Sequence, residues 1–339
     1  MKIYEHKELF LNDDDPELKY YQRRNEKKTS VRWGQRKLVI GEIAFLSLYW
    51  NTEKVPNPIL VCAGGAPGTH YSIIELLFPE ISEIHLYDPR KFRITKSSKI
   101  ICHQEYFTDE TAQQWSGRND VFFISDIRTA DYKKIQNLDE NEKQVMNDML
   151  MQQKWYIIIN PVHAFLKFRL PYSGGNRPTH MNYLDGHILK QTWAPQTSTE
   201  TRLIPFSPKH FKEWDCIKYE NQLFNFNVNI REKQKYQNPF NNSQTPIDSD
   251  ELLNDYDSTS EALILKYYLI HRTGSSNIKN IQSLSRLITS KLNENKKFKD
   301  TLKYLRKNPF AIKERNTKNN KYNKYNKYNK YNKYNKYNK

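Results

Sequence analysis

The sequence predicts an α/β protein built on a doubly wound, mainly parallel sheet of the Rossmann type with an antiparallel edge. Three apolar runs, at residues 59–65, 83–88 and 120–126, have the length of buried strands, and segments with helical spacing separate them. The first run ends in glycines and the other two end in an aspartate. Strands that alternate with helices form parallel sheets, because each crossover returns the chain to the same end of the sheet.

The same spacing rules assign the remaining elements. An apolar stripe at 37–50 predicts a helix packed on the sheet, and further helices are expected at 70–78 and 140–154. Two strands at 187–195 and 199–205 are expected to form the antiparallel edge. Additional strands are expected at 99–104, 154–161 and 223–230, and C-terminal helices at 261–272 and 280–292, after a turn-rich linker at 238–250.

Positive charge is concentrated at the C-terminus. The formal net charge is +16, and residues 307–339 hold eleven Lys and Arg against one acid, Glu314. Within them, residues 321–338 are Lys-Tyr-Asn repeated six times. Such a tract has no apolar stripe to bury, so it is expected to be disordered. A basic body and tail favour a polyanionic partner such as nucleic acid, although the tail could equally be a solubilising extension.

Cysteine usage and hydropathy exclude several classes. Cys62, Cys102 and Cys216 form no metal-ligand spacing and no disulfide framework, so neither a metal nor disulfides are expected. The N-terminus has no apolar signal core, and no run of about 18 apolar residues occurs. Secretion and membrane spanning are therefore not expected.

A glycine-rich turn follows the first predicted strand. Gly64, Gly65 and Gly68 stand between that strand and a helix, where glycine lets the backbone turn sharply and approach a ligand. Asp88 stands at the end of the next strand, where a carboxylate can accept hydrogen bonds from both ribose hydroxyls of an adenosine. An aspartate there can also be a simple helix cap. Together the two features predict a nucleoside cofactor.

Four ionisable residues lie at separate element ends. Lys37 opens the first helix, Asp126 ends a strand, Lys167 follows the predicted strand 154–161 by six residues, and Glu200 begins an edge strand. Singly, each could be a solvated surface charge. In a doubly wound sheet the carboxyl ends of the strands converge on one crevice, so Asp126, Lys167 and Glu200 are expected on the same side as Gly64 and Asp88.

The order Lys, Asp, Lys, Glu around a glycine-rich loop resembles the tetrad of RNA 2′-O-methyltransferases. Within that class the sequence is most similar to the poxvirus cap 2′-O-methyltransferases, which also serve as processivity subunits of the viral poly(A) polymerase. The resemblance rests on GQRKLVIGEIAFLS, GGAPGTH, LYDPR, ISDIR, INPV followed by LKFRLPY, and AP followed by TETRL, in that order. It covers about residues 31–205. It implies a Rossmann-like methyltransferase fold, with S-adenosylmethionine as the methyl donor.

The resemblance implies roles for the tetrad. Lys167 would be the general base that takes the proton of a ribose 2′-hydroxyl, and Lys37 the neighbouring cation that helps to lower its pKa. Asp126 and Glu200 would orient both amines. By the same pattern, the cofactor-binding residues would be Gln35, Leu38, Gly64, Gly68, Asp88, Arg90, Asp126 and Arg128.

The resemblance also implies a pocket for the methylated cap guanine, a flat cation best held between aromatic rings with a carboxylate at its edge. Tyr172 matches one ring, Glu220 matches an acid, and Tyr20 or Tyr21 in the N-terminal arm would supply the opposing ring. Gly174 stands where a second acid is expected.

The expected organisation is an irregular N-terminal arm (1–30), a methyltransferase domain (31–235), a helical extension on the same domain (236–307) and a disordered basic tail (308–339). The expected activity is methylation of the first transcribed nucleotide of capped mRNA, in the virion and host cytoplasm. Two other readings stay open: a processivity subunit bound to a poly(A) polymerase catalytic subunit, and a 2′-O-methyltransferase for internal sites of structured RNA.

Overall fold

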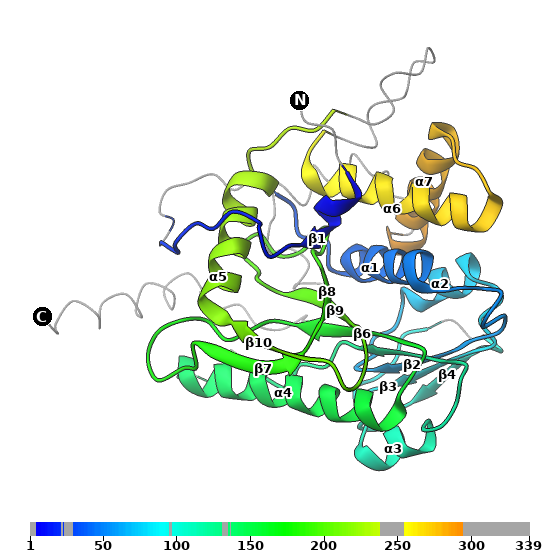
Figure 1. Ribbon diagram of the computed structural model, residues 1–339. Helices are drawn as coiled ribbons and strands as arrows, with labels where there is room; N and C mark the ends of the chain where they lie inside the picture. Colours follow the sequence, from blue (N-terminus) through cyan, green and yellow to red (C-terminus); the bar gives the residue numbers. More distant parts are fainter. Residues whose placement is uncertain are drawn as a thin grey trace, which may run out of the picture.

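The computed structural model describes residues 5–21, 23, 30–94, 97–130, 135, 137–237 and 254–293. Its centre is a single eight-stranded sheet in the order β1-β8-β9-β6-β5-β2-β3-β4 (Figure 1). The strands are β1 (Phe10–Leu11), β2 (Ile59–Ala63), β3 (Glu83–Tyr87), β4 (Ile100–His103), β5 (Val121–Ser125), β6 (His163–Phe168), β8 (Gly186–Leu189) and β9 (Thr201–Pro205). A separate antiparallel ribbon joins β7 (His180–Leu184) to β10 (Phe211–Asp215).

The sheet is doubly wound with an antiparallel edge, as predicted. Strands β4, β3, β2, β5 and β6 run parallel, and their order reverses direction between β2 and β5. On the other side β9 is antiparallel to β6, β8 to β9, and β1 to β8. Ligands bind such sheets at the carboxyl ends of the strands, beside the reversal. The β2–β5 boundary is therefore where a site is expected.

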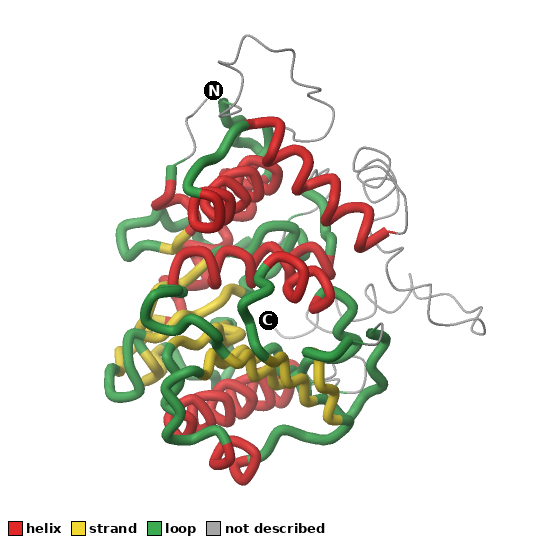
Figure 2. The backbone as a smooth tube through the Cα atoms, turned by 90° about the vertical axis from the view of Figure 1, so that its right-hand side faces the viewer, coloured by secondary structure: helices red, strands yellow, loops and turns green. Residues whose placement is uncertain are grey.

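Helices cover both faces of the sheet, so the molecule has three layers (Figure 2). They are α1 (Gly34–Tyr49), α2 (Tyr71–Leu77), α3 (Asp109–Gln114), α4 (Leu138–Ile159), α5 (Cys216–Asn225), α6 (Tyr256–Thr273) and α7 (Ile278–Asn293). α1, α2, α6 and α7 lie on one face, and α3 and α4 on the other (Figure 1). Because β2 and β5 are covered on both faces, every residue in them is buried, which explains their unbroken apolar runs.

The strand predicted at 154–161 is wrong, because α4 continues through Ile159 and β6 begins only at His163. The apolar run follows helical spacing: Trp155 and Ile159 are buried, whereas Ile157 between them is 41% exposed. Asn160 ends the helix in the left-handed conformation, with φ 48°. An apolar run of this length cannot be assigned by composition alone.

The strand predicted at 223–230 is also wrong, since α5 continues into a π-helical turn, η2 (Phe226–Arg231). In this segment apolar residues alternate with asparagines, a pattern typical of a strand with one face exposed to solvent. Both Asn225 and Asn227 are buried, however, and Asn227 donates its amide to the Ser198 carbonyl oxygen at 2.9 Å. The polar positions are satisfied inside the protein, so the alternation does not mark a strand.

The N-terminal arm is more ordered than expected. A 3₁₀ turn, η1 (His6–Leu9), leads into β1, which pairs with β8 at the edge of the sheet. Farther along, the Gln222 amide on α5 donates to the carbonyl oxygens of Asn12 and Asp15, both at 3.0 Å. These bonds hold the arm along α5.

Some expectations fall outside the described residues: the linker at 238–250, the end of the helical extension at 294–307, and the tail at 308–339. Among the helices of the described part, none combines the length and the hydropathy needed to cross a lipid bilayer.

The end of α4 gives a stability test. Ile159→Ala should lower the free energy of unfolding by about 2–5 kcal/mol, because the side chain is fully buried. Ile157→Ala should cost less than about 1 kcal/mol, because that side chain faces solvent on the helix. Urea unfolding measures both. In a strand the two side chains would share a face, so equal costs would contradict the helix.

Candidate active site

The turn after β2 requires glycine at two positions. Gly64 has φ +85°, and a Cβ there would lie 2.9 Å from the Asp126 carbonyl carbon. Gly68 has φ +75°, and its Cβ would lie 2.5 Å from the Ile94 Cδ1 atom. Both angles favour glycine. The loop therefore approaches the backbone at the end of β5 more closely than any side chain permits.

Asp88 follows β3 beside this loop, and its side chain is almost fully buried. Its carboxylate accepts the Ala66 amide at 3.1 Å, and the Arg90 guanidinium donates to both carboxylate oxygens, at 2.9 and 2.6 Å. Burial favours a raised pKa for Asp88, but the hydrogen bonds from Arg90 and Ala66 outweigh burial and lower it. Asp88 is thus an ionised acceptor, and Arg90, which was also predicted at the cofactor, donates two hydrogen bonds to it.

The first turn of α1 contacts the glycine loop through Gln35. The Gln35 Oε1 atom accepts the Thr69 hydroxyl at 2.9 Å and lies 3.3 Å from the His70 Nδ1 atom. The far ring nitrogen of His70, Nε2, lies 3.1 Å from the buried Glu42 carboxylate. Leu38, also predicted at the cofactor, is half-buried on the same helix.

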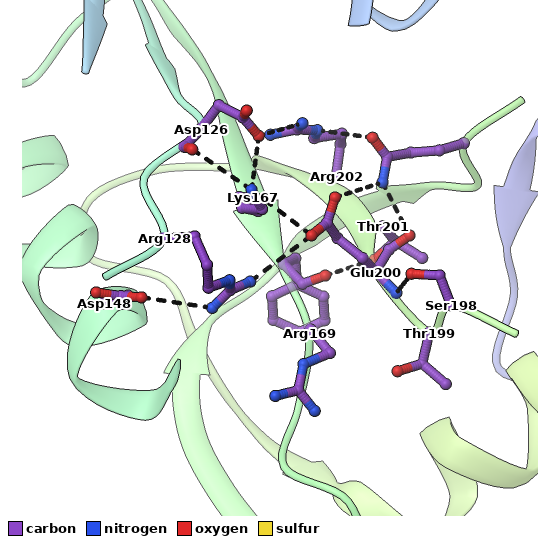
Figure 3. A network of polar contacts seen from close by, with 12 residues as sticks. Asp126, Arg128, Asp148, Lys167, Arg169, Ser198, Thr199, Glu200, Thr201 and Arg202 are labelled. Atoms are coloured by element: carbon purple, nitrogen blue, oxygen red, sulfur yellow. Dashed lines mark hydrogen bonds and ion pairs between the residues drawn. The ribbon is translucent and has the colours of Figure 1, made fainter. Parts of the chain in front are cut away.

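Three of the tetrad residues, Asp126, Lys167 and Glu200, form one cluster at the carboxyl ends of β5 and β6 (Figure 3), and Lys37 of α1 joins it through Glu200. The Lys167 amine lies 3.0 Å from an Asp126 carboxylate oxygen and 3.6 Å from Glu200. The Lys37 amine lies 2.7 Å from the other Glu200 oxygen. Glu200 therefore bridges both amines, and side chains from four distant segments meet in one place.

Arg202 belongs to this cluster, and the sequence reasoning missed it. Its guanidinium is buried and donates to Asp126 at 2.6 Å, to the Ser125 carbonyl oxygen at 3.1 Å and to the Gln191 side chain at 3.0 Å. The Gln191 amide in turn donates to the Glu200 carbonyl oxygen at 2.9 Å. The available signal was the spacing of Glu200 and Arg202, which are two residues apart and so face the same side of an extended chain.

The position of Lys167 differs from the prediction. It does not follow a strand by six residues but lies inside β6, where it pairs in register with Arg202 of β9. Arg128 lies at the rim, 3.8 Å from Glu200 and 3.6 Å from Asp148 (Figure 3).

The cluster changes the ionisation of its members. Burial lowers the pKa of the Lys37 amine, and the neighbouring Arg202 charge adds to this, against the raising effect of Glu200. Burial alone would raise the pKa of both carboxylates. The nearby cations, Lys167 first, hold the pKa of Asp126 and that of Glu200 well below the usual range. The site thus combines two fixed negative charges with an amine whose charged form is disfavoured.

The predicted cap residues gather beside α5. The Glu220 carboxylate is buried and accepts the Ser173 amide at 2.7 Å, which places it next to Tyr172. The Arg169 guanidinium, paired with Glu142, lies 4.5 Å from the centre of the Tyr172 ring. One face of that ring is therefore occupied by a cation.

The N-terminal arm reaches the same helix. Tyr20 and Tyr21 each make an edge contact with the Phe224 ring, at 5.1 Å between centres, and both remain exposed. Phe224 is one helical turn beyond Glu220, so the two share a face of α5. The structure thus brings all four predicted cap residues to one side of α5.

The loop after Tyr172 accounts for the glycine at position 174. Gly174 has φ +100°, and a Cβ there would lie 3.0 Å from an Arg177 guanidinium nitrogen. Arg177 also donates to the Gly174 carbonyl oxygen at 2.6 Å. A side chain at 174 would be strained, and the nearest charge to that position is positive.

A glycine turn after β2, a carboxylate after β3 and a buried lysine–carboxylate cluster beside the strand reversal define a Rossmann-like α/β fold with a ligand site at the carboxyl ends of its strands. A family described as poly(A) polymerase regulatory subunit matches residues 4–293. The chain belongs to this family.

The chain is also similar to individual viral proteins. The chain is 25% identical over 243 residues to the cap-specific mRNA (nucleoside-2′-O-)-methyltransferase of fowlpox virus. This alignment covers 66% of this chain and 77% of that protein. The myxoma virus enzyme of the same name is 25% identical over 248 residues, covering 66% and 70%. A multifunctional RNA-capping protein of bluetongue virus aligns with a TM-score of 0.41 at 11% identity, over 78% of this chain and 45% of its own.

The carboxylates predict acid sensitivity. Because the pKa of Glu200 is lowered on folding, its contribution to stability is present above its unfolded value of about 4.3 and is lost as pH falls below that value. In urea unfolding from pH 7 to pH 3, Glu200→Gln should therefore lose less stability than the wild type. The exposed Glu53→Gln variant should follow the wild-type curve. Parallel curves for Glu200→Gln and the wild type would show that Glu200 is not held ionised by the cluster.

Proposed function

We propose that this protein is a cap-specific mRNA 2′-O-methyltransferase, which transfers a methyl group from S-adenosylmethionine to the ribose 2′-hydroxyl of the first transcribed nucleotide. The observation that carries the proposal is the convergence of Lys37, Asp126, Lys167 and Glu200 at the strand reversal. The names of the fowlpox and myxoma relatives support the same activity.

The residues around the glycine loop fit a nucleoside-bearing methyl donor. Gly64 and Gly68 leave a surface without side chains, and Asp88 offers an ionised carboxylate suited to two ribose hydroxyls. Arg90 donates hydrogen bonds to that carboxylate, so a bound ligand would displace Arg90 or share the carboxylate with it. S-adenosylmethionine supplies a sulfonium-bound methyl group. Gln35 on α1 would complete the set from the other side of the loop.

The tetrad would prepare the attacking oxygen. The Lys167 amine would take the proton that the attacking 2′-hydroxyl releases. Arg202 stays charged throughout, so Arg202 and one lysine cation balance Asp126 and Glu200. The amine of the other lysine can then be neutral without leaving a net buried charge. Two carboxylate contacts hold the Lys167 amine in place, and oriented reactants can gain roughly 7–11 kcal/mol.

The cap guanine would lie beside α5, between Tyr172 and the ring supplied by Tyr20 or Tyr21. The Arg169 guanidinium covers one face of Tyr172, which leaves the opposite face for the base. The buried Glu220 carboxylate would supply the negative charge that favours the 7-methylated, cationic base.

A second role is favoured by the family description, which names a poly(A) polymerase regulatory subunit. We propose that the protein also binds a poly(A) polymerase catalytic subunit and RNA, as its excess of basic residues would suit. Co-purification with that subunit, and longer poly(A) products in its presence, would test this role independently of methyl transfer.

The activity is tested with radiolabelled S-adenosylmethionine and three short RNAs that differ only at the 5′ end. The ends are a 7-methylguanosine cap, an unmethylated cap and a triphosphate. We expect label on the first 2′-oxygen of the methylated-cap RNA. Label on all three RNAs would favour an enzyme for internal sites, and label on none, with cofactor bound, would refute the methyltransferase proposal.

Lys167→Ala should lower kcat by at least about 100-fold while leaving the dissociation constant for S-adenosylmethionine near wild type, since a general base acts only in the transition state. Lys37→Ala is the matched comparison, because burial lowers the pKa of the Lys37 amine. A larger loss in Lys37→Ala than in Lys167→Ala would move the base to Lys37.

A further inference from the structure

The first turn of α1 carries Lys37 but has no ordinary cap. The helix begins after Trp33, which makes no side-chain capping hydrogen bond. Helix ends without caps fray, because their first amide groups lack partners within the helix. Lys37 lies in this turn, and its amine donates to the Glu200 carboxylate at 2.7 Å. Some other contact must therefore fix the turn.

Arg36, next to Lys37, supplies that contact. Its guanidinium donates to both oxygens of Glu261 on α6, at 2.6 and 2.5 Å, and neither side chain is exposed. It also donates to the hydroxyls of Ser285 and Thr289 on α7, both at 2.9 Å. A bidentate, buried pair fixes both the position and the rotation of the turn.

The same carboxylate holds the segment that leads to Glu200. The Trp193 indole donates to Glu261 at 2.8 Å, from the loop between β8 and β9. This residue is fully buried in the left-handed conformation, with φ 59°. Its carbonyl oxygen accepts the Trp33 amide at 2.9 Å, which joins the loop directly to the start of α1. The two segments that carry Lys37 and Glu200 thus meet at one carboxylate.

We propose that Glu261 is a positioning residue, which sets the distance between Lys37 and Glu200 through Arg36 and Trp193. The inference rests on the proposed methyl transfer for its kinetic consequence but not for its geometry. Glu261 does not touch the site itself. It lies on α6, beyond the segment at 31–205 that carries the sequence resemblance, and gives the C-terminal helices a role in the reaction.

Glu261→Gln tests this, because it keeps the shape and removes the charge. We expect kcat for methyl transfer to fall roughly 10- to 100-fold with KM for cofactor and capped RNA near wild type, since small displacements of reacting groups cost that much. Tyr268→Phe is the matched control, since it removes one hydrogen bond of the same helix, to the Leu77 carbonyl oxygen at 2.8 Å. It should lower Tm and leave kcat unchanged. Equal losses of kcat in both variants would overturn the proposal.

A second readout does not need activity. Reductive methylation followed by peptide mass spectrometry measures how well the Glu200 ion pair protects Lys37, with the exposed Lys266 as reference. Lys37 should be labelled faster in Glu261→Gln than in the wild type or in Tyr268→Phe. If Glu261→Gln does not fold, Trp193→Phe removes the indole donor, together with part of the buried ring, and keeps the Arg36 pair. It should show an intermediate increase.

Unchanged labelling of Lys37 in the folded variants would overturn the positioning role. If the wild type transfers no methyl group, the proposed function fails, while the labelling still decides whether Glu261 positions Lys37.

Discussion

The site depends on a single constraint, the pairing of the partly buried Asp126 carboxylate with cations at the end of β5. A charge that is partly withdrawn from water needs a partner, and here Lys167 from β6 and Arg202 from β9 pair with it. These three side chains come from neighbouring strands, two parallel and one antiparallel. The inserted antiparallel strand β9 is therefore what brings a permanent positive charge next to the lysine. Without β9, the sheet would keep the glycine turn and Asp88 but would lose the cation that balances Asp126.

Much of this arrangement could be predicted from the sequence, because it rests on local patterns. The glycines after β2 and the aspartates that end β3 and β5 are strand-end signals, and the topology brings strand ends together. The strand predicted at 154–161 was wrong because buried helices and buried strands have the same composition. The strand predicted at 223–230 was wrong because the asparagines that alternate with its apolar residues are hydrogen-bonded inside the protein. Arg202 and Glu261 were missed because their partners are distant in sequence and only the folded chain reveals them.

The two halves of the proposed substrate site are built differently. The methyl-transfer half stands on strand ends and a glycine turn, which are fixed by the core. The cap half stands on a loop around Gly174, on α5 and on an arm from the N-terminus, held by side-chain hydrogen bonds such as those of Gln222. In the proposed function, methyl transfer would take place on elements packed in the core, and the RNA end would be recognised by surface segments that can vary without disturbing them.

The pairing of β1 with β8 also affects how the protein behaves in solution. Without the arm, β8 would be an edge strand with unpaired amides and carbonyls, open to edge-to-edge association with another chain. The arm covers that edge with two residues, Phe10 and Leu11, before it continues toward α5. The segment that would present an aromatic ring to the cap thus also protects against aggregation, so loss of the arm would affect solubility as well as recognition.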